Sequence, residues 1–84
     1  MSDVAKYSAY LCAQHNVEND KYDDAITYFN KISTTGKSFI VGETLIGLAT
    51  CYDAKGEYKK ALEYFEKALN KNSVLLPGHP NIVA

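Results

Sequence analysis

The amino-acid sequence predicts an all-α fold in which two similar pairs of antiparallel helices stack on each other. Apolar residues recur at helical spacing along four segments of the chain. The second half also repeats the pattern of the first half at an offset of 36 residues (61 − 25), when Ala25 is superposed on Ala61. An internal repeat of this length is typical of helical solenoids, in which each unit buries its apolar face against a neighbour.

The clearest helical pattern lies in "GEYKKALEYFEKALNK", residues 56–71. Its apolar residues fall on one face, and lysine and glutamate fill the remainder. The segment "DKYDDAITYFNKIS", residues 20–33, repeats this scheme. Both segments are therefore predicted to form the second helix of a pair, with apolar faces made of Tyr22, Ala25, Ile26, Phe29 and Ile32 in one and Tyr58, Ala61, Leu62, Phe65, Ala68 and Leu69 in the other.

The segments ahead of these two helices align at the same offset and supply the first helix of each pair. Asn19 or Asp20, and Gly56, stand where the left-handed conformation that ends a helix is needed. Short turns at these points force the two helices of a pair to run antiparallel. The predicted helices span residues 3–18, 21–33, 38–54 and 57–72, and their aligned first-helix positions are Ala9, Cys12, Ala13 and Asn16 against Leu45, Leu48, Ala49 and Tyr52.

This arrangement resembles the tetratricopeptide repeat, whose pattern is W-x2-L-G-x2-Y followed by A-x3-F, A and P. Residues 38–76 match it well, and residues 3–37 match it more loosely, with Asp20 in place of the turn glycine. The resemblance implies a short right-handed superhelix, an α-solenoid fragment. Within it, Ala13 against Ala25 and Ala49 against Ala61 would allow close helix approach, and Phe29, Phe65 and Tyr52 would fill the space between repeats.

The closing segment "LLPGHPNIVA" resembles the Gly-x-His-Pro joint of the kinesin light chain type of this repeat, although Gly78 stands one residue nearer His79. We interpret residues 77–84 as a linker and the start of a truncated further helix, with Pro80 in its first turn. This interpretation predicts that the functional object is larger than the 84 residues, through further sequence or through another copy.

Composition and charge exclude several classes of function. Ten acidic residues against nine lysines and no arginine give no basic surface, so we expect no nucleic-acid partner. No apolar run approaches the roughly 20 residues of a membrane span, so we expect no membrane partner. Cys12 and Cys51 are too few and too widely spaced for a metal knuckle, and two lone thiols favour a reducing, cytoplasmic location.

Residues that could carry chemistry occur singly, so no enzyme, metal site or cofactor is predicted. His79 has no acidic residue or cysteine within four positions. Cys12 and His15 share a helix face but lack an orienting third group. The segment "TTGKS" lacks the first glycine and the strand of a phosphate loop, and the acidic residues from Glu18 to Asp24 miss the spacing of a calcium loop.

The family resemblance implies a different function, which is binding another protein or peptide in the groove that the first helices of successive repeats form. Tyrosine suits such a groove because it combines a large contact area with a polar tip. The Lys and Asn residues with which some members hold a partner's terminal carboxylate are replaced here by Tyr10, Gln14 and Gly47, so that mode is not expected. The groove positions would be Tyr7, Tyr10, Gln14, Val17, Glu43, Ile46, Thr50 and Asp53.

An architectural role is the alternative: the chain would be a piece of a longer repeat array, or would form a homo-oligomer by stacking on another copy. At least three repeats are generally needed for a stable solenoid. Tyr7 and Tyr10 fall off the packing face of the first helix and are compatible with either hypothesis, since exposed residues of a terminal helix can also touch another copy. The apolar residues expected at the stacking end are Val74, Leu75, Leu76, Ile82 and Val83.

Overall fold

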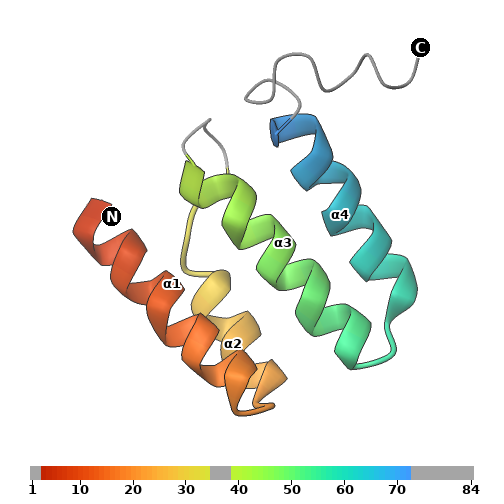
Figure 1. Ribbon diagram of the computed structural model, residues 1–84, viewed down its shortest axis with the longest axis horizontal. Helices are drawn as coiled ribbons and strands as arrows, with labels where there is room; N and C mark the ends of the chain where they lie inside the picture. The colour runs from red at the N-terminus through yellow and green to blue at the C-terminus, as the bar shows by residue number, and fades with distance from the viewer. Residues whose placement is uncertain (1–2, 35–38, 73–84) are drawn as a thin grey trace.

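The computed structural model describes residues 3–34 and 39–72, and these residues form four helices and no strand. The helices are α1 (Asp3–Glu18), α2 (Tyr22–Phe29), α3 (Phe39–Ala54) and α4 (Tyr58–Asn72). Figure 1 shows α1 at one end of the molecule, α4 at the other and α3 between them. The predicted all-α fold of two antiparallel helix pairs is confirmed.

The two helix pairs turn in the same way. Asp20 and Gly56 adopt the left-handed conformation, with φ of 60° and 83°. The Lys21 N–H then reaches back to the Asn16 carbonyl at 2.8 Å, and the Glu57 N–H to the Tyr52 carbonyl at 2.8 Å. These bonds, together with those from the Asp20 and Gly56 N–H groups, are the Schellman pattern that satisfies the last carbonyls of a helix.

Helix α2 is shorter than the predicted helix over residues 21–33, and it ends at Phe29. After Phe29 the backbone bonding tightens from four residues to three. The Lys31 N–H donates to the Tyr28 carbonyl at 3.1 Å, and the Ile32 N–H to the Phe29 carbonyl at 3.0 Å. Such a tight last turn is common where a helix ends without a glycine.

The core lies where α1, α2 and α3 meet. Ala13 and Ala25 are completely buried there together with Phe29, Leu48 and Cys51. A second cluster joins α3 to α4 through Val41, Leu45 and Ala68. The small residues of each pair, which include Ala49 and Ala61, are buried as the sequence predicts.

Phe29 connects the two repeats through a close approach to α3. A Cβ atom built on Gly47 would lie only 2.2 Å from the Phe29 Cζ atom, so the Phe29 ring occupies the space of a side chain at position 47. The ring also packs edge-on against Tyr10 of α1, with ring centroids 6.0 Å apart. Phe29 therefore holds α1, α2 and α3 together from the middle of the interface between the repeats.

Four sequence predictions about packing are wrong. Tyr10 was expected to lie off the packing face, yet it is partly buried against the core. Cys12 was expected in the core and is exposed, because in the part of the chain that the structure describes no helix packs against its face of α1. Tyr58 is 68% exposed and Phe65 is 40% exposed for the same reason at the other end, on α4.

The predicted stacking end, comprising Val74, Leu75, Leu76, Ile82 and Val83, lies outside the described residues, as do His79 and the joint at 77–84. The repeat boundaries at residues 37 and 76 also lie outside them and stay predictions.

Candidate functional site

A hollow of about 250 Å³ lies between α1 and α3. Residues of α1 line one side of the hollow and residues of α3 line the other. The Phe29 ring packs against two of these lining residues, Tyr10 and Gly47. We call it the α1–α3 groove. Its lining residues are Tyr10, Gln14, Val17, Glu43, Ile46, Gly47 and Thr50.

A hydrogen-bonded chain crosses the groove. The Gln14 Nε2 group donates to the Tyr10 hydroxyl at 3.1 Å, and the Tyr10 hydroxyl donates to the Glu43 Oε1 atom at 3.3 Å. Burial raises the pKa of Tyr10 above its usual value, and the nearby Glu43 charge raises this pKa further. Tyr10 therefore stays protonated at neutral pH and fixes the position of the Glu43 carboxylate.

The structure brings six of the eight predicted groove residues into this one hollow: Tyr10, Gln14, Val17, Glu43, Ile46 and Thr50. Tyr7 lies at its edge, where its ring stacks on Tyr10 with centroids 6.4 Å apart. Asp53 is exposed and is not among the lining residues. Gly47, which the family resemblance places where some members carry a carboxylate-holding residue, also lines the hollow.

A second candidate surface is the outer face of α4, made of Tyr58, Leu62, Phe65 and Leu69. Leu62 and Leu69 are 59% and 63% exposed. Phe65 and Leu69 border an apolar hollow of about 350 Å³, which Ala68 and Ile46 of α3 complete. Ile46 thus takes part in both hollows and separates the α1–α3 groove from the α4 face.

The groups considered for chemistry do not come together in the residues 3–34 and 39–72. His15 is exposed on α1, where its ring lies 3.4 Å from the Asn19 side-chain amide. Asp23 of the acidic run pairs with Lys55 and so ties α2 to the end of α3. Within the described part of the chain, no three histidine, cysteine or acidic side chains are placed to hold a metal ion, and no helix has the length and apolar character needed to cross a membrane.

Comparison with known families identifies the class of protein that this fold and groove define. The family model described as Tetratricopeptide repeat matches residues 7–71, which covers both helix pairs. The chain belongs to the tetratricopeptide repeat family. Repeats of this family are generally protein–protein interaction modules and typically non-enzymatic. Neither the curated proteins nor the solved structures gave a match to this chain.

Proposed function

We propose that this protein binds a peptide or helix of another protein in the α1–α3 groove and has no catalytic activity. The observation that carries the proposal is the convergence of polar and apolar side chains from two helices on one hollow. Tyr10, Gln14 and Glu43 supply hydrogen-bonding groups, and Val17 and Ile46 supply apolar contact. Such a mixture suits a partner chain that must be both oriented and desolvated.

The size of the groove supports the same conclusion. Its volume of about 250 Å³ is below the range of about 300–1,000 Å³ typical of small-molecule sites. The hollow is suited to one or two side chains of a partner whose backbone runs along α1 and α3. Tyr7, exposed at the edge of the hollow and stacked on Tyr10, extends the surface available to such a chain.

The experiment that tests this proposal starts from peptides of 12 residues selected for binding from a random display library. Backbone amide chemical shifts would then be mapped for each peptide. We expect the largest shifts on α1 and α3, with affinity reduced about threefold to tenfold by Gln14→Ala and Thr50→Ala. Thr27→Ala, an equal change at an exposed site of α2, is the matched control. Unchanged affinity in both groove variants would refute the proposal.

The architectural role is a second candidate, because among the described residues α4 packs only on α3, whereas its counterpart α2 packs on both α1 and α3. Phe29 of α2 is fully buried by α3, whereas the equivalent Phe65 of α4 is 40% exposed. Tyr22 and Ile26 are likewise partly buried against the core, whereas Tyr58 and Leu62 are exposed. We propose that another repeat, either from further sequence or from a second copy of this chain, covers the α4 face.

Sedimentation over a hundredfold range of concentration tests stacking by a second copy. We expect the mass to rise with concentration, and Leu69→Glu to keep the protein monomeric. Leu69 borders the α4 hollow and does not line the α1–α3 groove, so this variant leaves the groove lining unchanged. Ile46→Ala is unsuitable, because Ile46 lines both hollows. A monomer at every concentration would exclude a second copy and leave a repeat from further sequence as the occupant.

A further inference from the structure

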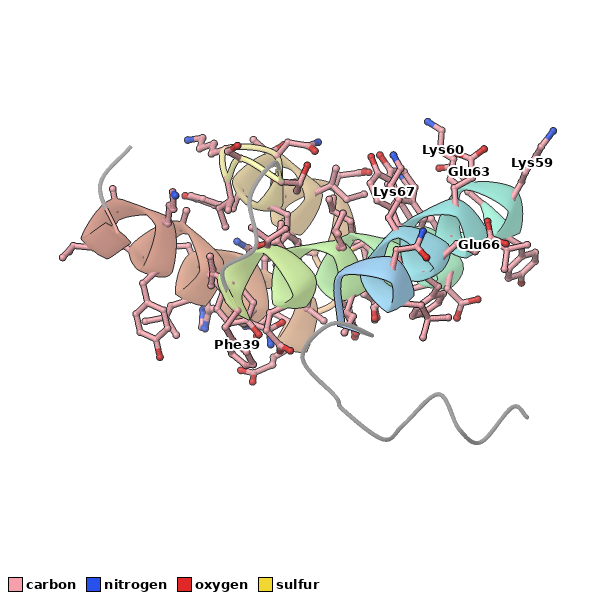
Figure 2. All side chains as sticks on the ribbon, turned by 90° about the horizontal axis from the view of Figure 1, so that it is seen from above. Phe39, Lys59, Lys60, Glu63, Glu66 and Lys67 are labelled. Carbon is pink, nitrogen blue, oxygen red and sulfur yellow. The ribbon has the colours of Figure 1, made fainter. Side chains whose placement is uncertain are left out.

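The charges of this protein differ between the two groove-forming helices and α4. Helices α1 and α3, which form the groove, contain four acids and one lysine, Lys6. Helix α4 has the opposite balance, with four lysines and two glutamates. In Figure 2 the labelled Lys59, Lys60 and Lys67 project on the side of the molecule where α2 lies, opposite Phe39. The acids of the groove helices are Asp3, Glu18, Glu43 and Asp53.

Several cations are held by partners away from the groove. The Lys60 ammonium lies 5.1 Å from the ring centroid of Tyr52, and that of Lys67 lies 5.1 Å from the ring centroid of Tyr64. Lys55, in the turn that follows α3, pairs with Asp23 of α2. None of the seven residues that line the groove is a lysine. The groove therefore presents one ionised group, the Glu43 carboxylate, without a cation beside it in the lining.

Glu43 is also poised to accept a further hydrogen bond. Its Oε1 atom accepts a hydrogen bond from the Tyr10 hydroxyl at 3.3 Å, and the Gln14 side-chain amide donates to that hydroxyl. Among the described residues, its Oε2 atom has no protein donor. Because the side chain is half-buried, water screens its charge less than at a free surface. An ion pair formed here is consequently stronger than an ordinary surface pair.

We propose that the α1–α3 groove selects a partner segment carrying a lysine or arginine side chain, which ion-pairs with Glu43 while neighbouring apolar residues of the segment contact Val17 and Ile46. This inference rests on the proposed function, because it names the partner chemistry of the same groove. An acidic anchor would be repelled by the Glu43 carboxylate. In this groove the protein supplies the carboxylate and the partner supplies the cation, which is the reverse of the arrangement in a groove that binds a partner's carboxylate.

Affinity measurements with the groove-binding peptides from the display experiment test the inference. We expect these peptides to be enriched in lysine and arginine. Glu43→Gln should reduce their affinity about tenfold or more. Glu63→Gln, which removes an equal charge from α4 on the side where α2 lies, should change affinity less than about twofold. Groove-binding peptides that are neutral or acidic, or that bind Glu43→Gln equally well, would overturn the inference while the proposed function survives.

A second measurement uses defined small probes. In amide and side-chain chemical-shift titrations, n-butylammonium should saturate shifts at Glu43 and Tyr10, whereas n-butanol should not reach half that occupancy at the same concentration. The difference should vanish in Glu43→Gln. Equal responses to the two probes would overturn the cationic anchor. A library that yields no peptide in the groove would instead refute the proposed function, and the anchor with it.

Discussion

Gly47 is restricted to glycine by its neighbour and not by its own backbone. It lies inside α3, where alanine would normally be favoured, but the fully buried Phe29 ring occupies the position of its side chain. Thr44, one turn earlier, shows another local conflict. It is completely buried, and its Oγ1 atom has no hydrogen-bond partner among the described residues. Both residues are buried in α3, so a change of a few atoms at either position alters the packing of this helix.

Gly47→Ala should therefore destabilise the protein. Overpacking costs about 1–3 kcal/mol and the better helix propensity of alanine returns about 1 kcal/mol, so we expect a net loss of about 1–2 kcal/mol. Urea unfolding followed by circular dichroism would measure this loss. The double variant Phe29→Leu with Gly47→Ala should be more stable than the sum of the single changes predicts. A single variant as stable as the parent would show that the ring has room to move.

Thr44→Val should stabilise the protein by about 1 kcal/mol, because a buried hydroxyl without a partner is replaced by a methyl group of similar shape. Thr50→Val is the matched control, since the Thr50 hydroxyl is exposed and already donates to the Ile46 carbonyl at 2.9 Å. Thermal and urea unfolding of both variants would compare them. A loss of stability in Thr44→Val would indicate a hydrogen bond that the structure does not contain.

The turns between helices depend on backbone conformation and not on packing. No atom lies within 4 Å of a Cβ atom built on Gly56, but its φ of 83° is in the left-handed region. The equivalent Asp20 adopts the same conformation with a φ of 60°, which acidic and amide side chains tolerate better than most. The two pairs therefore reach the same turn with different residues.

Gly56→Ala should cost about 1 kcal/mol through backbone strain alone, and Gly56→Asn should cost less. Stability in urea should therefore decrease in the order glycine, asparagine, alanine. This order separates strain from steric conflict, since asparagine is the larger side chain. An asparagine variant less stable than the alanine variant would mean that space, not φ, limits the position.

Cys51 places a titratable group in the packing between α3 and the first repeat. Burial raises the pKa of its thiol from 9.0 to about 11. The folded state therefore keeps the proton that the unfolded chain releases, so this contribution to stability is complete below pH 9 and is lost as pH rises towards 11.

We expect the free energy of unfolding to fall by about 1 kcal/mol between pH 8 and pH 10. Above pH 10, Tyr10, Tyr22 and Lys55 should add losses of the same sign, because their pKa values are raised as well. Cys51→Ala should flatten the profile below pH 10, and Cys12→Ser, at the exposed thiol, should leave it unchanged. An identical slope in Cys51→Ala would assign the dependence to other groups.

At the scale of the whole molecule, equivalent residues have different surroundings because the two described repeats lie on opposite sides of one shared interface. Phe29 lies between the repeats and is buried, whereas Phe65 stands 36 positions later (65 − 29) on the open face of α4 and is 40% exposed. The first repeat shows the complementary effect, with Cys12 exposed where the equivalent Leu48 is buried. The position of a repeat residue in the stack therefore decides how deeply it is buried and how much it contributes to stability.

Phe29→Ala should cost about 3–5 kcal/mol or prevent cooperative folding, whereas Phe65→Ala should cost about 1 kcal/mol at low protein concentration. Urea unfolding at micromolar concentration would measure both variants. If copies stack through α4, the cost of Phe65→Ala should grow as the concentration rises. Equal costs at low concentration would indicate that the α4 face is covered within one chain.

The sequence by itself determined the helices, their pairing and the turns of this protein, because periodicity and turn chemistry act over a few residues. The family resemblance also implied eight groove positions, of which six line one hollow. Only the tertiary structure decided that Tyr10 packs on Phe29, that the Phe29 ring fills the side-chain space of Gly47 and that Cys12, Tyr58 and Phe65 are exposed. The physical reason is that an apolar stripe shows which face of a helix seeks cover, whereas its burial depends on whether another helix lies there.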